Sequence, residues 1–198
     1  MDRKTIITIG RENGSGGRYI GEKLAQKLGI NCYNNELISE ITKKYSSDLN
    51  YVEKNDEQPP EGAFYFGGQP IPAKVFEEQS SLIREIARKE SCIFIGRASD
   101  YVLKDFDNVI NVFVHAPLAS RIERYSRRNN ISAVEAEKEI TKQDKKRSSF
   151  YKFYTNQIWG EAKNYHICID TSKVGIDGAV QLIENYMTLN TMNNDIIQ

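Results

Sequence analysis

A glycine-rich stretch near the N-terminus constrains the fold of this chain more than any other feature. Residues 10–18 read GRENGSGGR, and they follow a β-branched run at residues 5–9. Beyond the glycines, Ile20, Leu24 and Leu28 repeat every four positions, which predicts an amphipathic helix. Glycines let consecutive N–H groups turn inward, and a helix N-terminus adds partial positive charge. The strand, loop and helix together predict a concave anion site of the kind that binds a nucleotide's phosphates.

We expect four residues of this loop to bind phosphate through backbone N–H groups: Gly14, Ser15, Gly16 and Gly17. When the loop is aligned on Gly-x-Gly, the usual phosphate-binding lysine position is Gly17, and Arg11 replaces the first loop glycine. The hydroxyl that normally helps to hold magnesium is absent, because Arg18 and Tyr19 occupy the next two positions. Arg18 or Arg11 could supply the missing positive charge. The alternative is a tight turn between strand and helix that binds nothing.

The remaining chain alternates between apolar strand-like runs and amphipathic helices. Strands are predicted at residues 30–33, 92–95, 109–114 and 165–169. Helices are predicted from residue 34 or 35, at 73–89, from Pro117, from Ala133 with Ser132 and Glu135 as a capping box, and at 176–187. This order predicts an α/β fold: a parallel sheet covered by helices on both faces, in one domain at residues 1–189. Residues 47–72, rich in Pro and Gly, are expected to form an irregular excursion, and residues 190–198 a polar, frayed tail.

Composition limits the classes of partner. Lys and Arg number 27, as do Asp and Glu, so the whole chain has no electrostatic attraction to nucleic acid or anionic membranes. No apolar run approaches the roughly 20 residues that span a bilayer. Cys32, Cys92 and Cys168 form no CxxC pair and are predicted to be buried, reduced thiols. We therefore expect a cytoplasmic protein with neither nucleic acid nor membrane as partner.

Two residues follow a predicted buried strand at the edge where ligands of parallel sheets collect. Arg97 could hold an acceptor phosphate with its planar, bidentate fork, although a structural ion pair is the alternative. Asp100 could orient a base or a ribose, or could cap a helix instead.

A basic segment further along could fold over phosphates as a helical lid, at about residues 121–160. Arg121, Arg124 and Arg128 share one helical face, and Arg147 follows in the next predicted helix. Arg121, Arg124 and Arg147, with Arg18, could bind the oxygens of a triphosphate. Interspersed acidic residues allow the alternative of a solvated, salt-bridged helix pair.

Aromatic residues follow the basic segment at positions 150–159. They could stack on a base or mediate a homodimer, but packing in the core or at an interface is favoured. His115 and His166 lack the carboxylate or cysteine spacing of a metal site, so no metal ligands are predicted.

The order of these motifs resembles the cytidylate kinase-like family, from about residue 6 to residue 186. The segments that carry the resemblance are residues 10–18, 33–37, 95–103, 121–128 and 144–147, with Tyr151 and Tyr154. The resemblance implies a P-loop kinase fold with a lid, and transfer of the γ-phosphoryl group of ATP to CMP or dCMP, with magnesium as cofactor. In such a kinase we expect Arg18, Arg121, Arg124 and Arg147 to stabilise charge on the transferred phosphoryl group, and Arg97 to hold the acceptor. Asn34 departs from the aspartate expected at its position.

Two alternatives stay open beside the kinase. The absent lysine and hydroxyl also fit a catalytically silent, nucleotide-binding sensor or regulator. The loop at residues 51–72 could instead build a pocket for another small metabolite as acceptor.

Overall fold

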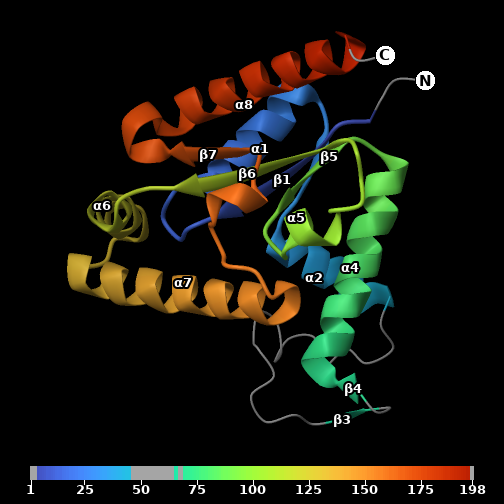
Figure 1. Cartoon of the computed structure of the whole chain (residues 1–198). Coiled ribbons are helices and arrows are strands. Elements are labelled where there is room, and N and C mark those ends of the chain that lie inside the picture. The colour runs from blue at the N-terminus through green and yellow to red at the C-terminus, as the bar shows by residue number, and fades with distance from the viewer. Residues whose placement is uncertain (1–3, 46–64, 67–68, 197–198) are drawn as a thin grey trace.

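A five-stranded parallel sheet forms the centre of the computed structural model, which describes residues 4–45, 65–66 and 69–196 (Figure 1). Its strands are β1 (Ile6–Arg11), β2 (Asn31–Tyr33), β5 (Cys92–Ile95), β6 (Val109–His115) and β7 (Ile167–Asp170). They lie in the order β2-β5-β1-β6-β7, and every paired strand runs parallel to its neighbour. β1 is central, so the loop that follows it leaves the sheet in the middle of its carboxyl edge.

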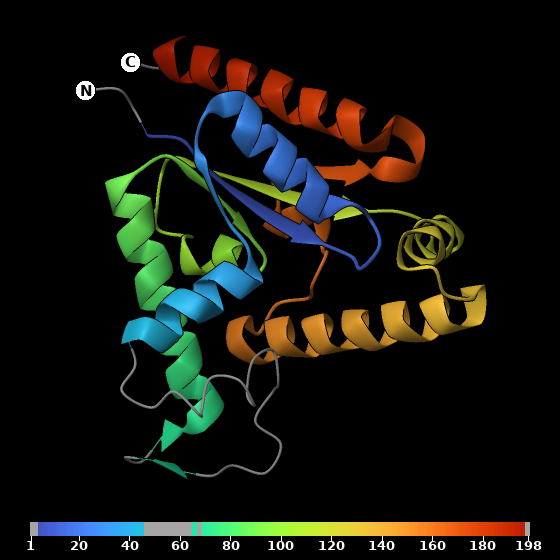
Figure 2. The same cartoon turned by 180° about the vertical axis from the view of Figure 1, so that it is seen from behind.

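Helices cover both faces of the sheet, as the sequence predicts (Figure 2). Helices α1 (Gly17–Leu28) and α8 (Thr171–Ile196) lie on one face. Helices α2 (Asn35–Tyr45), α4 (Ile71–Lys89) and α5 (Ser99–Val102) lie on the other. Side chains of a strand alternate between faces, so Ile7 and Ile9 pack in the core beneath α1 and α8, whereas Ile6 packs beneath α2 and α4.

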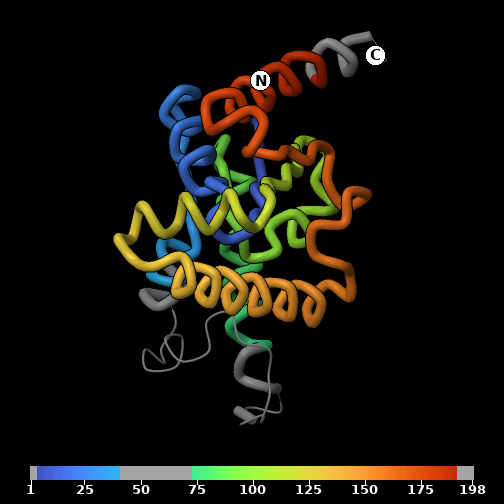
Figure 3. Tube along the Cα trace, turned by 90° about the vertical axis from the view of Figure 1, so that its left-hand side faces the viewer, coloured from blue at the N-terminus to red at the C-terminus, as the bar shows by residue number. Residues whose placement is uncertain are grey.

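Two further helices, α6 (Leu118–Asn129) and α7 (Ala133–Thr155), pack against each other beyond the carboxyl ends of the strands (Figure 3). The capping box predicted at the start of α7 is confirmed. The N–H of Glu135 donates to Ser132 Oγ at 3.2 Å, and the N–H of Ser132 donates to Glu135 Oε2 at 3.0 Å.

Several boundaries differ from the sequence-based expectation. β1 does not end before Gly10 but continues to Arg11, because both residues pair with β6. α8 is interrupted at Gly175 (φ 69°, ψ −173°), so the predicted helix start at residue 176 agrees with the beginning of its longer part. That part continues to Ile196, so the predicted helix end at residue 187 and the frayed tail from residue 190 are wrong. Gly175 is a true break, because glycine adopts this backbone without steric cost.

Part of the expected irregular excursion is regular. Residues 65–66 (β3, Tyr65–Phe66) and 69–70 (β4, Gln69–Pro70) form a short antiparallel pair, and α4 already begins at Ile71. Proline is tolerated in the first turn of a helix, where its missing N–H would have no intrahelical partner. Residues 46–64 and 67–68 lie outside the described residues.

The cysteines are free thiols, and their burial differs from the prediction at one position. Cys92 is buried and Cys32 is half-buried, but Cys168 is exposed because it lies on β7, at the edge of the sheet. Within the described ranges, no helix is both long and apolar enough to cross a bilayer.

Candidate active site

The loop between β1 and α1 has the backbone that its glycines predict. Gly14 and Gly16 have positive φ values of 77° and 91°, a region that residues with a Cβ rarely adopt. A Cβ on Gly16 would also lie 2.3 Å from Ile176 Cδ1. Ser15 is fully buried, and its hydroxyl donates to the carbonyl of Glu12 at 2.8 Å. Ser15 therefore fixes the loop through its side chain, and any contact with a ligand would come from backbone N–H groups of the loop and of the first turn of α1.

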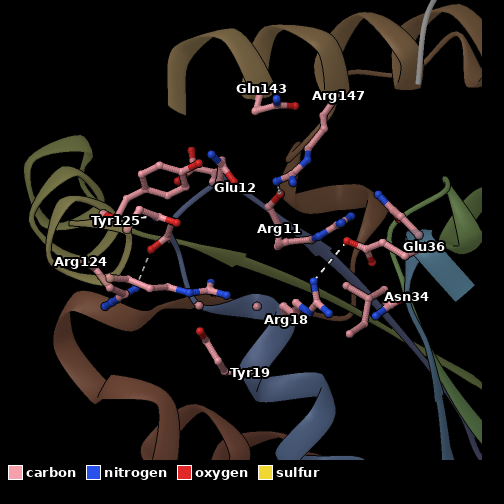
Figure 4. Close-up of a pocket in the computed structure, with 18 of the residues that line it drawn as sticks. Arg11, Glu12, Arg18, Tyr19, Asn34, Glu36, Arg124, Tyr125, Gln143 and Arg147 are labelled. Atoms are coloured by element: carbon pink, nitrogen blue, oxygen red, sulfur yellow. Dashed lines mark hydrogen bonds and ion pairs between the residues drawn. The ribbon is translucent and has the colours of Figure 1, made fainter. Parts of the chain in front are cut away.

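A cavity of about 480 Å³ opens beside this loop, a size typical of small-molecule sites (Figure 4). Its walls come from the loop, the first turn of α1, the start of α2, the end of β5, and the helices α6 and α7. The arginines in the lining are Arg11, Arg18, Arg97, Arg124, Arg128 and Arg147; the carboxylates are Glu12 and Glu36. Six arginines against two glutamates make this cavity strongly positive in a chain whose formal net charge is zero. Such a site favours a ligand with several negative charges.

Arg124 joins α6 to the loop and also faces the cavity. Its Nη1 donates to the carbonyl of Gly14 at 2.9 Å and to Thr171 Oγ1 at 3.2 Å. Thr171 in turn donates to the carbonyl of Ser15 at 2.7 Å. The first residue of α8 and a turn of α6 therefore hold the loop from one side.

Arg147 approaches the same cavity from α7, on the side opposite to α1 (Figure 4). Its Nη1 donates to the carbonyl of Arg11 at 3.3 Å, whereas its buried Nε has no hydrogen-bond partner within the part of the chain that the structure describes. A buried donor without a partner is costly, so an anionic ligand at this position would satisfy it.

Arg18 lies in the first turn of α1 and is largely exposed. Its guanidinium pairs with Glu22 at 2.8 Å and with Glu36, at the start of α2, at 3.2 Å. Both pairs are exposed and therefore weak, so this side chain can exchange them for a phosphate.

Arg121 is placed differently from the other arginines that the sequence singles out: it does not line the cavity. Its Nε donates to the carbonyl of Ala116 at 2.9 Å and lies 3.2 Å from Glu12 Oε2. Its Nη1 bonds Asp144 Oδ2 at 2.5 Å and the carbonyl of Asn13 at 3.1 Å. Since Asp144 Oδ1 also accepts the N–H of Asn13 at 2.7 Å, the group ties α6 and α7 to the loop from behind.

Arg97 follows β5 after Gly96 and lines the large cavity. It is buried, its φ is 59°, and its Nη2 donates to Ser39 Oγ of α2 at 2.8 Å. α2 therefore fixes the Arg97 guanidinium through Ser39. The start of α2 is itself capped by Asn34, since the N–H of Leu37 donates to Asn34 Oδ1 at 2.9 Å.

Asp100 lines a separate small cavity of about 30 Å³ rather than the large one. Its carboxylate accepts the hydroxyl of Tyr151 at 2.6 Å, and burial raises the pKa of Asp100, an effect that the Tyr151 hydrogen bond partly offsets. Asp100 does not cap α5, because the cap position is Ala98. Arg11, Arg97 and Arg147 line both cavities, so Asp100 lies behind the main site.

Several lining residues were not singled out from the sequence. These are Tyr19, Asn35, Glu36, Tyr125, Asn129 and Gln143. Gln143 and Tyr125 are adjacent in sequence to Asp144 and Arg124. That adjacency is the one sequence feature that could have placed these two residues at the cavity. Phe150 and Tyr151 pack in a small core with Ala98, which confirms the preference for core packing over base stacking at these two positions.

The comparisons with known proteins agree with this geometry. The model of the cytidylate kinase-like family matches residues 6–173. The chain belongs to this family.

A cytidylate kinase from Methanocaldococcus jannaschii is 26% identical over 183 residues, which cover 91% of this chain and 96% of the relative. A cytidylate kinase from Pyrococcus horikoshii is 25% identical and covers 91% of this chain and 87% of its own. Family membership and these relatives support a kinase, a phosphotransferase that uses a nucleotide.

Solved structures support the same fold. An uncharacterized protein from Eubacterium ventriosum superimposes with a TM-score of 0.77 at 29% identity, covering 93% of this chain and 99% of that one. A shikimate kinase from Acinetobacter baumannii gives a TM-score of 0.55 at 16% identity, with 96% and 95% covered. The sheet is therefore that of the P-loop kinases, as predicted.

Proposed function

We propose that this protein transfers the γ-phosphoryl group of ATP to a nucleoside monophosphate, CMP or dCMP. The observation that carries the proposal is the positive cavity, which is lined by the glycine loop and by Arg97. Arg97 is bonded to Ser39 of α2, and the start of α2, with Asn34 and Glu36, lies on the side of the cavity away from Arg124 and Tyr125 (Figure 4). One end suits a triphosphate and the other a second phosphorylated ligand. The two cytidylate kinases that match over most of their length support the choice of acceptor.

Phosphoryl transfer requires positioning and electrostatic stabilisation rather than covalent chemistry from the protein. The loop N–H groups of Gly14, Gly16 and Gly17 would bind the donor phosphates at the N-terminus of α1. Arg124 and Arg147, which approach from α6 and α7, would neutralise charge that builds up on the transferred group. Arg18 would leave its exposed carboxylate partners and join them.

Arg97 would hold the acceptor's phosphate. Burial and the hydrogen bond to Ser39 fix its orientation before any ligand binds, so little side-chain entropy is lost on binding. Arg121 would act on the reaction through the loop, as a positioning residue. Asp100 would support the acceptor end from the small cavity behind it.

The site could hold Mg²⁺ bound together with ATP. No cluster of three or more His, Cys, Asp or Glu side chains suited to a metal occurs among the residues described. Mg²⁺ in nucleotide sites is commonly held by one or two carboxylates together with substrate phosphates. Glu12 lies in the cavity wall, and its Oε2 is already bonded to Arg121 and to the N–H of Ala116, so its other carboxylate oxygen would be the one offered to the ion. The ion would offset charge on the phosphates.

A silent nucleotide-binding protein is the second candidate, favoured by one observation. Gly17 and Arg18 replace the lysine and the hydroxyl of the usual phosphate loop. A third candidate keeps the kinase and changes the acceptor to another small phosphorylatable metabolite.

An ADP-release assay with magnesium-ATP against CMP, dCMP, UMP, AMP and GMP separates these candidates. We expect turnover with the cytidine nucleotides. Replacing Arg97 with Ala should raise the acceptor KM by about 10²-fold, because a charge-assisted bidentate pair is lost, and should leave the KM for ATP within about threefold. An unchanged acceptor KM would refute the role of Arg97. ATP binding without turnover on any acceptor would favour the silent protein.

A further inference from the structure

Gly17 is a glycine for a steric reason rather than a conformational one. It is the first residue of α1, and its φ is not in the positive region. Any residue could adopt this helical backbone, yet a Cβ at this position would lie 2.5 Å from Arg11 Cβ and 3.0 Å from Arg11 Cγ. These atoms lie close to the backbone and cannot swing away, so the side chain of Arg11 occupies the space in which a residue-17 side chain would start.

The other end of Arg11 is equally confined. A Cβ on Gly96, at the end of β5, would lie 1.8 Å from Arg11 Nη1. The side chain therefore runs from the start of α1 to the end of β5, between two glycines. Along this path it lines the large cavity, and Figure 4 shows it between Arg147 above and Arg18 below.

The two positions are those at which the loop departs from the usual Gly-x-x-x-x-Gly-Lys pattern. Arg11 stands at the first glycine and Gly17 at the lysine, whose ammonium reaches the β- and γ-phosphates. The chain thus has a cation where a glycine is usual, and a glycine where the cation is usual. Because the two side chains would compete for one space, the substitutions form a coupled exchange.

We propose that Arg11 replaces the loop lysine as the cation for the donor's phosphate chain, and that Gly17 is required to make room for it. The proposal deepens the proposed function and rests on it for the identity of the ligand, a nucleoside triphosphate. The extension of β1 by pairing of Arg11 with Val114 fixes the root of the side chain, and Arg147 Nη1 holds its carbonyl at 3.3 Å. The tip lies beside Gly96, next to Arg97, so the guanidinium bridges the donor and acceptor ends.

The first test replaces the charge and keeps the shape. Arg11→Met should weaken binding of magnesium-ATP and of inorganic tripolyphosphate, measured by calorimetry, by at least about tenfold, and lower kcat by about 10²-fold or more. Lys23→Met, on the exposed side of α1 and outside the cavity lining, is the control and should leave both within about threefold. If the affinity of Arg11→Met for tripolyphosphate falls by less than tenfold from the wild-type value, the proposal is overturned.

The second test exchanges the two residues. Gly17→Lys alone should lose tripolyphosphate binding, because its Cβ overlaps Arg11. The double variant Arg11→Gly/Gly17→Lys should recover at least about tenfold in affinity over Gly17→Lys. Binding by Gly17→Lys equal to the wild type, or no recovery in the double variant when its circular dichroism shows it folded, would show that the two side chains do not share one space.

The readouts separate this inference from the proposed function. Wild-type protein that binds tripolyphosphate but transfers no phosphoryl group would refute the kinase, while loss of binding in Arg11→Met would still support the inference. Full turnover by Arg11→Met would refute the inference and leave the kinase intact. Wild-type protein that binds no tripolyphosphate would overturn both.

Discussion

The two sides of the glycine loop use arginine in opposite ways. Behind the loop, Arg121 is 9% exposed and is surrounded by the carboxylates of Glu12 and Asp144 and by backbone carbonyls. In front of it, Arg124 and Arg147 bond backbone carbonyls of the loop and face a cavity in which arginines outnumber carboxylates. The first side is balanced in charge without any ligand, whereas the second is not.

This difference shows why an arginine count cannot define a phosphate site. Arg121 and Arg124 lie three residues apart on the same helix, yet one is a structural cation and the other faces the ligand space. What separates them is the distribution of carboxylates contributed by distant segments. The structural side keeps the loop in shape, and the cavity side supplies unbalanced charge for an anion.

The largest effect is expected behind the loop. Arg121→Met leaves the carboxylates of Glu12 and Asp144, which are 26% and 19% exposed, without their cation. We expect the free energy of unfolding in urea to fall by about 3 kcal/mol. Arg127→Met is the matched control on the same helix: its pair with Glu123 is exposed and should contribute less than about 0.5 kcal/mol. Equal losses for the two variants would erase the contrast between the two sides.

A slightly smaller effect, and on activity rather than stability, is expected in front of the loop. Arg124→Met should lower kcat/KM by about 10²-fold, since one preorganised donor to the transferred group is lost. Its cost in stability should be near 1 kcal/mol, the value of an ordinary hydrogen bond. Steady-state kinetics and urea unfolding, with Arg127→Met again as control, measure both. A large loss of stability with full activity would place Arg124 among the structural arginines.

The smallest expected effect is on the pH dependence of stability, and it comes from the buried carboxyl of Asp100. Burial raises the pKa of Asp100 in the folded protein, so folding favours its protonated form. The resulting stabilisation is complete below the unfolded-state pKa, near 4, and is lost as the pH rises through the folded-state value. Asp100→Asn, which keeps an acceptor for Tyr151 but cannot ionise, should therefore gain stability relative to the wild type as the pH rises from 4 to 8.

The free energies of unfolding of the wild type and of Asp100→Asn, measured from pH 4 to 8, test the direction of this change. If the wild type instead became more stable relative to Asp100→Asn as the pH rises, the hydrogen bond from Tyr151, and not burial, would dominate the pKa of Asp100.

The sequence predicts most of the fold because its signals are local. The β-branched run before the glycines, the four-residue repeat of α1 and the capping box of Ser132 and Glu135 all lie within a few positions of the elements they define. Local signals do not give the ends of β1 and α8, because tertiary pairing extends the strand to Arg11 and the helix continues past residue 187 to Ile196.

The candidate site could be predicted in part. Arg18, Arg97, Arg124 and Arg147 do line the cavity, and Gly14, Gly16 and Gly17 do form its loop. Arg121 and Asp100 lie outside the large cavity. The sequence could not show this, because the partners that hold them, Glu12 and Tyr151, are distant in sequence. The steric coupling of Arg11 and Gly17 requires atomic positions that no spacing provides.

Transfer of the γ-phosphoryl group from ATP to CMP can be followed directly. The protein is incubated with magnesium-ATP labelled in the γ-phosphate and with CMP, and the products are separated by chromatography. We expect the label to move to CDP while an equal amount of ADP forms, and Arg124→Met to slow the transfer by about 10²-fold. Label that stays in ATP, or that is released as inorganic phosphate without CDP, would contradict the proposed function.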